Sequence, residues 1–154
     1  MDFYAHICKN GDVLIEHTPL SGLTYCEKCG AEVLACCPSC QSPIKEWHYS
    51  MATLGKPSYE RPAYCQKCGK PYPWTAAAIE ATTELIEEET ELDELQREKL
   101  ISSLPDIVSE TPKTSVAVVR VKKALLAAGK FTSEGIRQFA IDFGCELAKK
   151  QLGL

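Results

Sequence analysis

The chain has 154 residues, of which 25% are charged, and its formal net charge at pH 7 is −4. This length suits one ordinary domain, or two small domains if something besides an apolar core stabilises one of them. The weakly acidic balance argues against a strongly basic nucleic-acid-binding protein. The longest apolar stretch, residues 115–129, is broken by Arg120, Lys122 and Lys123, so the sequence predicts no membrane-spanning helix.

The N-terminus, MDFYAHICKNGD, lacks the basic start and apolar run of a secretory signal, so we expect a cytoplasmic protein. In that reducing compartment, paired cysteines are metal ligands more often than disulfides. The chain has nine cysteines, an odd number that would leave one over in a complete disulfide framework. The sequence therefore favours metal sites.

A change in composition near Trp74 predicts two domains, residues 1–74 and 75–154. The first half is rich in Cys, Gly, Pro and aromatic residues and has short β-prone segments at 12–17 and 32–36. It has too few apolar residues for a sizeable core, so we expect its folding to depend on metal. The predicted fold class is α+β and zinc-dependent: small metal-bound, β-rich zinc ribbons followed by an α-helical C-terminal region.

Three Cys-x-x-Cys pairs stand in the first half: Cys26 with Cys29, Cys37 with Cys40, and Cys65 with Cys68. A two-residue spacer lets one tight turn deliver two thiolates to a Zn²⁺ ion at about 2.3 Å. Gly30 and Gly69 follow their pairs directly and free the backbone to turn, whereas Gln41 follows the middle pair. Cys36 stands beside Cys37, and we interpret it as an apolar neighbour.

Six ligands fill one and a half tetrahedral sites, so the N-terminus must supply the rest. Cys8 is one candidate, and its partner is Asp12, His6 or His17. Two arrangements are open. In the sequential one, Cys8 and Asp12 join the pair at 26–29, and the pairs at 37–40 and 65–68 form a second site. In the other, the first two pairs share a site and Cys8 joins the last pair. We prefer the sequential arrangement because each ribbon then closes locally.

The segments ICKNGD, YCEKCGAEVLACCPSCQSPI and PAYCQKCGKPYPWT resemble an uncharacterised family of bacterial double zinc-ribbon proteins with a helical tail. In that family the opening reads Cys-x-Asn-Gly-His, so Asp12 stands here where the pattern has histidine. A carboxylate can bind zinc, but it is a less common structural ligand. The resemblance implies two Zn²⁺ ions and no particular activity. Its implied ligands are Cys8, Cys26, Cys29, Cys37, Cys40, Cys65 and Cys68.

The second half predicts three or four helices. The first covers about 76–90 and continues to about 103, where Pro105 interrupts it. A second covers about 113–128 and ends at Gly129, a favourable residue just past a helix end. The last, about 133–151, has apolar residues at the spacing of one buried helix face, and Cys145 within it is interpreted as a packing residue.

Our leading functional hypothesis is a non-enzymatic zinc-binding adaptor or interaction protein. The ribbons are its scaffold, and the C-terminal helices bind a protein partner or a second copy. The alternative is a nucleic-acid-binding module, suggested by the ring side chains of Trp47, His48 and Tyr49, which could stack on bases. A zinc hydrolase with an open first site is a third hypothesis, with Glu16 or His17 as its base.

Overall fold

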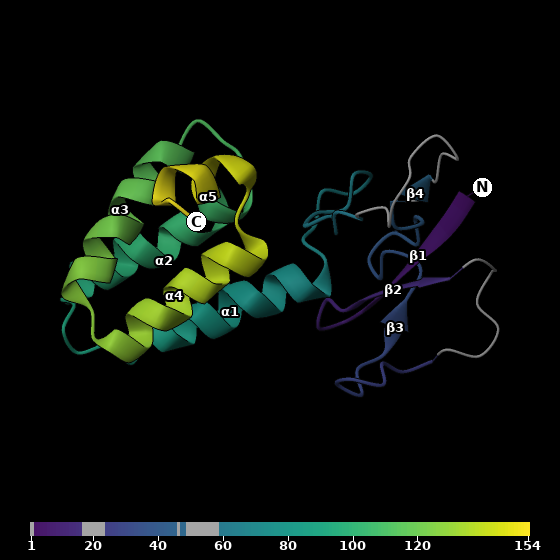
Figure 1. Cartoon of the computed structure of the whole chain (residues 1–154), viewed down its shortest axis with the longest axis horizontal. Coiled ribbons are helices and arrows are strands. Elements are labelled where there is room, and N and C mark those ends of the chain that lie inside the picture. Colours follow the sequence, from purple (N-terminus) through teal and green to yellow (C-terminus); the bar gives the residue numbers. More distant parts are fainter. Residues whose placement is uncertain (1, 17–23, 46, 49–58) are drawn as a thin grey trace. The chain divides into compact units, whose positions relative to one another are not determined.

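The computed structural model describes residues 2–16, 24–45, 47–48 and 59–154 (Figure 1). Its chain divides into two compact units, Met1–Ala76 and Ala77–Leu154. The first unit contains the described strands, and the second contains most of the helical residues. Each unit is held together in a different way.

The first unit contains a small antiparallel sheet of four strands in its described part. β1 (Asp2–Cys8) lies at its centre and pairs with β2 (Val13–Glu16), β3 (Val33–Leu34) and β4 (Trp47–His48). The β-prone segments expected at 12–17 and 32–36 contain β2 and β3, whereas β1 was not expected. The sheet brings Cys8, the last residue of β1, opposite Val33 of β3.

Among the side chains that the structure describes, the apolar packing of the first unit is limited to a few. Ile7 and Ile44 are buried, and Trp74 is 1% exposed. The ring of Tyr72 stacks on Trp74 with 4.6 Å between the ring centres, and the indole N–H of Trp74 donates to the carbonyl of Pro62 at 2.9 Å. A core this small supports the expectation that something besides apolar packing stabilises this unit.

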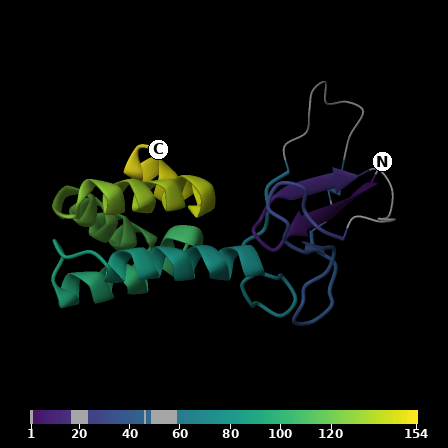
Figure 2. The ribbon, with the colours of Figure 1, turned by 90° about the horizontal axis from the view of Figure 1, so that it is seen from below.

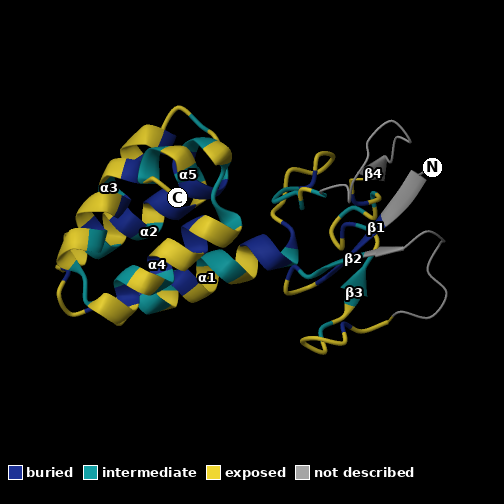
Figure 3. Ribbon diagram, viewed as in Figure 1, coloured by how far each residue is buried: buried dark blue, intermediate teal, exposed yellow. Residues whose placement is uncertain are grey.

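Five helices follow: α1 (Pro73–Glu87), α2 (Glu94–Val108), α3 (Thr114–Ala127), α4 (Lys130–Phe143) and α5 (Glu146–Leu152). Their buried residues lie on the sides where helices of the second unit face one another (Figure 3). α1 and α4 run alongside each other (Figure 2). Because Gly135 has no side chain, the side chain of Leu85 can approach the backbone of α4 there. None of these helices combines the length and apolar character needed to cross a membrane.

The expectation of three or four helices was wrong, because the first and the last predicted helices are each divided into two. α1 ends at Glu87, and α2 begins anew after Asp93. The carboxylate of Asp93 accepts from the amide of Gln96 at 2.7 Å, and the Gln96 side chain accepts from the Asp93 amide at 2.9 Å. This reciprocal capping box satisfies two amides that a helix start leaves without partners, and so favours a fresh helix there.

Two further helix boundaries differ from the expectation. Pro105 lies inside α2 and is followed by three more helical residues, because Ile107 and Val108 are buried and hold the last turn. The last predicted helix is divided between α4 and α5. Gly144 ends α4 in an extended conformation, and the amide of Cys145 donates to the carbonyl of Ile107 at 2.8 Å instead of continuing the helix.

The buried carboxylate of Glu89 joins the α1–α2 connection to the start of α4. Glu89 is 7% exposed and accepts from the amides of Glu91 at 2.9 Å and Gly129 at 3.2 Å. A hydrogen bond from the Thr132 side chain, followed by these amides, lowers the pKa of Glu89. The charged form is therefore the one that stabilises the second unit.

We expect Glu89→Gln to remove a pH-dependent part of the stability. Because the folded pKa lies below the unfolded value, Glu89 contributes above the unfolded pKa and loses that contribution as pH falls through its folded pKa. The difference in unfolding free energy between parent and variant should therefore be largest near neutral pH and shrink below about pH 4. Urea unfolding followed by helical circular dichroism measures it.

The exposed neighbour Glu88 supplies the control, as Glu88→Gln at the same pH values. Because parent and variants share the first unit, acid effects on that unit cancel in the comparison. A parent-to-variant difference for Glu89 that stays constant across the pH range would contradict the assigned role.

Candidate metal centres

The three Cys-x-x-Cys loops share one backbone geometry. In each loop, the carbonyl of the first cysteine accepts at 2.8 Å from the amide of the residue four positions later. The amide of the first cysteine donates at 2.8–2.9 Å to the carbonyl of the residue five positions later. The residues flanking each loop form a short antiparallel bridge: Tyr25 with Glu32, Cys36 with Pro43, and Tyr64 with Pro71. Equal sequence spacing has therefore produced three equivalent hairpins.

A left-handed residue closes each of these hairpins. Gly30 and Gly69 have φ of 73° and 75°, and Gln41 has φ of 63° at the equivalent place. Glycine adopts this conformation without steric cost, whereas a residue with a Cβ atom is strained there. The turn directs both cysteine side chains of a pair to the same side.

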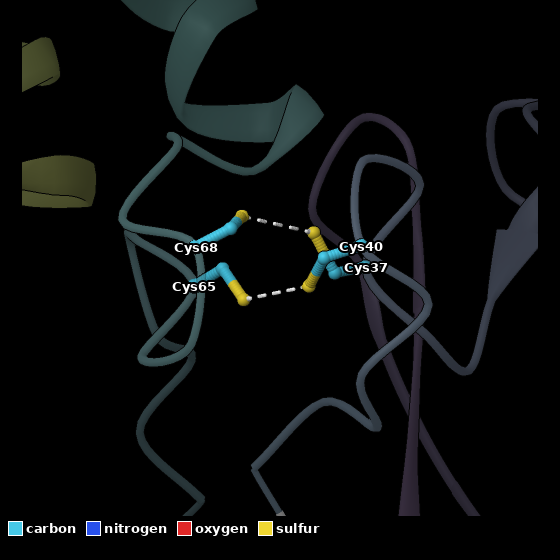
Figure 4. Close-up of side chains that lie close together, drawn as sticks. All are labelled: Cys37, Cys40, Cys65 and Cys68. Atoms are coloured by element: carbon cyan, nitrogen blue, oxygen red, sulfur yellow. Dashed lines mark hydrogen bonds between the residues drawn. The ribbon is translucent and has the colours of Figure 1, made fainter.

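The middle and last hairpins bring four cysteines together (Figure 4). The sulfur of Cys37 lies 3.8 Å from that of Cys68, and the sulfur of Cys40 lies 3.7 Å from that of Cys65. All four sulfur atoms lie within 4.8 Å of one another. These distances are far longer than a disulfide bond of about 2.05 Å. Ligands 2.3 Å from a tetrahedral metal would be about 3.8 Å apart, which matches this group.

Backbone amides and a hydroxyl favour the thiolate forms of Cys65 and Cys40 in this group. The amides of Cys68 and Lys67 donate to the Cys65 sulfur and lower the pKa of Cys65 to about 6. The Ser42 hydroxyl lies 3.3 Å from the Cys40 sulfur, and with the Ser42 amide it lowers the pKa of Cys40. A thiolate is the form that binds metal.

The β1–β2 hairpin is the fourth turn of this kind and is one residue shorter than the others. The amide of Gly11 donates to the carbonyl of Cys8 at 2.8 Å, and the Cys8 amide donates to the carbonyl of Asp12 at 3.0 Å. Gly11 has φ of 97°, and Arg61 donates to its carbonyl at 2.6 Å. The shorter turn places a carboxylate where the other loops have a second thiol.

Asp12 completes a second group of four with Cys8, Cys26 and Cys29. One oxygen of Asp12 lies 3.6 Å from the Cys8 sulfur and 3.5 Å from that of Cys26, and the sulfurs of Cys8 and Cys29 are 3.6 Å apart. Oxygen and sulfur ligands at about 2.0 and 2.3 Å from one tetrahedral metal would be about 3.5 Å apart. The donor set therefore fits a metal ion.

Burial raises the pKa of Cys8 to about 11, whereas the Ala31 amide and the Asn10 side chain lower the pKa of Cys29. The thiolate of Cys8 thus needs a neighbouring cation more than that of Cys29 does. A metal in this group would supply that charge.

The eight residues named from the sequence fall into these two groups of four, in the sequential arrangement. His6 is buried in β1 outside both groups, and His17 lies outside the described residues. Cys36 is not part of either group and occupies the bridge position held by tyrosine in the other two hairpins. Of the proposed aromatic group, Trp47 and His48 form β4, but their side chains and all of Tyr49 lie outside the described part of the chain.

Two four-ligand groups in a small β-rich unit, followed by helices, define an α+β protein with two candidate metal centres. The chain belongs to the family described as uncharacterized proteins conserved in bacteria (DUF2321), whose model matches residues 2–152. No match to a curated protein or to a solved structure was found. The function is therefore argued from the site itself.

We expect Gly69→Ala to destabilise the first unit by about 1 kcal/mol, because alanine is strained at positive φ. No atom lies within 4 Å of the added Cβ, so the cost is conformational and not a clash. Both tryptophans of the chain, Trp47 and Trp74, belong to the first unit, so urea unfolding followed by tryptophan fluorescence reports on it.

Gln41→Gly is the matched control, since it removes the same strain from the equivalent position. It should leave the stability of the first unit equal or higher. If Gly69→Ala is as stable as the parent, the left-handed turn does not constrain the hairpin as described.

Proposed function

We propose that the protein is a zinc-binding, non-enzymatic interaction protein. Its two metal-bearing hairpin pairs form a rigid scaffold, and its helical unit supplies the surface for a protein partner or a second copy. The observation that carries this proposal is the closure of both groups: each brings four ligand atoms within 4.8 Å of one another. A structural zinc site is closed in this way.

The donor chemistry supports zinc as the metal. Four thiolates, or three thiolates and a carboxylate, suit a borderline-soft ion with tetrahedral geometry. The ligand distances of both groups fit Zn²⁺ without rearrangement of the hairpins. Bound zinc would link hairpins that are far apart in the sequence, and so stabilise a unit with a small apolar core.

The same closure argues against a zinc hydrolase. A catalytic zinc keeps one position for water or substrate, whereas Asp12 supplies the fourth donor of the first group. The base suggested for such an enzyme was Glu16 or His17, and neither side chain lies in the described part of the chain. No described contact supports that mechanism.

Exposed apolar side chains on the helices support the interaction role. Leu126, near the end of α3, is 89% exposed, and Phe131, at the start of α4, is 80% exposed. Val116 and Val119 of α3 are about half exposed. Clustered exposed apolar surface is typical of sites that bind other proteins. The nucleic-acid alternative rests on Trp47–Tyr49, for which no side-chain contact is described.

We expect elemental analysis of freshly purified protein to give two zinc ions per chain. Asp12→Ala should bind the ion of the first group at least about tenfold more weakly. Loss of a residue that only orients a metal ligand already weakens metal binding by about that factor, and loss of the ligand itself should weaken it at least as much. Competition with a chromophoric chelator measures this affinity. Asp12→His restores a common structural zinc ligand and should retain both ions.

Two ions bound with unchanged affinity in Asp12→Ala would show that Asp12 is not a ligand. One ion in the parent would show that only the four-cysteine group holds metal. An unchanged fold after complete chelation would contradict the scaffold role, since a metal-dependent unit should unfold.

We expect the zinc-loaded full chain to self-associate or to retain a protein partner from a bacterial host. Lysine cross-linking should place the contact on the second unit, which carries seven of the lysines. Analytical ultracentrifugation and mass spectrometry of the cross-linked species measure both outcomes. A protein that remains monomeric, without a cross-linked partner, would contradict the interaction role.

A further inference from the structure

An apolar trough with a basic rim lies between α2 and α3. Its volume is about 360 Å³, within the range of ligand-binding pockets. The apolar residues that line the trough include Leu100, Val116 and Val119, and the cations that line it are Lys99, Arg120 and Lys123. We call it the α2–α3 trough.

The trough presents one face of α3. Val116, Val119, Arg120 and Lys123 follow the i, i+3, i+4, i+7 spacing that places side chains on one helix face. Val116 is 51% exposed and Val119 is 50% exposed, above the buried Leu100. These two half-exposed valines, one turn apart and next to the cations, form an apolar strip that a partner can cover.

The charges of the trough have a single sign. Three cations line it and no lining residue is acidic, although residues 75–98 of the same chain carry nine acidic side chains and one basic one. Arg120 donates to the hydroxyl of the buried Ser103 at 2.9 Å, which fixes its guanidinium on the rim. Complementary charge therefore selects an acidic occupant.

The shape of the trough favours a helix. Its lining runs from Leu92, just before α2, to Leu100 within that helix, and from Val116 to Ala124 on α3, which is about 12 Å along α3. This length matches about two turns of a partner helix, whose apolar side chains at i, i+3 or i+4, and i+7 would enter the trough.

We propose that the α2–α3 trough binds an acidic amphipathic helix of a partner protein, with apolar side chains on its floor and carboxylates paired with Lys99, Arg120 and Lys123. This inference rests on the proposed interaction function and names the chemistry of its partner. Pairing at the rim sets specificity and association rate, while apolar burial supplies most of the affinity.

The test is selection from a library of 15-residue helical peptides, randomised in sequence and displayed on phage, against the zinc-loaded full chain. Enriched peptides are synthesised, and their Kd is measured by fluorescence anisotropy with the parent and three variants. Lys99→Glu/Lys123→Glu reverses rim charge, and Val119→Asp blocks the apolar wall. Lys122→Glu makes a matched charge change on α3 at a residue that does not line the trough. Circular dichroism checks that each variant is folded.

The expected peptides carry net negative charge with apolar residues at helical spacing. Their Kd should rise roughly tenfold or more in the double variant and in Val119→Asp, and change less than about twofold in Lys122→Glu. Binding to the parent should weaken with added salt. Absence of enriched peptides, enrichment of uncharged or basic sequences, or equal effects of all variants would overturn the proposal.

Two outcomes distinguish the acidic-helix proposal from the proposed interaction function. If the chain retains a partner that Val119→Asp and the double variant do not disturb, the interaction function stands and the trough is not its site. If the parent dimerises without enriching acidic peptides, and Val119→Asp abolishes the dimer, the occupant is a second copy and the acidic-helix proposal fails.

Discussion

The first unit depends on the convergence of four ligand atoms at each of two points. Four thiolates less than 5 Å apart would repel one another, and a cation at their centre would offset that repulsion. Hydrogen bonds within the hairpins favour two of these thiolates: backbone amides lower the pKa of Cys65, and the Ser42 hydroxyl and amide lower the pKa of Cys40. Few apolar side chains are buried around them in the described part of the unit, which is why we propose that metal binding stabilises it.

The second unit, in contrast, has a conventional apolar core. Leu104, Ile107, Val121 and Ile136 are almost completely buried, and the helices that carry them pack side against side. The buried hydroxyls of Ser103 and Thr114 are hydrogen-bonded, which avoids a large desolvation cost. Glu89 is the clearest case, since it connects a loop to a helix start. One half of the chain thus contains two candidate metal centres, whereas the other is packed by its own apolar side chains.

The sequence predicted what is local and missed what depends on tertiary contacts. Equal spacing of the cysteine pairs predicted shared turns, because a tight turn involves only its own residues. β1 was missed because Ala5, His6, Ile7 and Cys8 are all buried, which leaves no alternation of apolar and polar residues. Spacing alone allowed two ways to group the pairs, since the choice depends on the sheet register that sets Cys8 against β3. The break at Gly144 depends on a hydrogen bond to α2 that no local pattern encodes.

The four-cysteine group also has a consequence for how this family can diverge. The pairing of β4 with β1 and the last hairpin fix the ends of the chain segment between His48 and Tyr64, and the free energy of closing a loop grows only with the logarithm of its length. Insertions and deletions between the hairpins should therefore be tolerated during evolution. A single inserted residue within a hairpin would misdirect a sulfur atom, so drift in length should accumulate between the cysteine pairs and spare the pairs themselves.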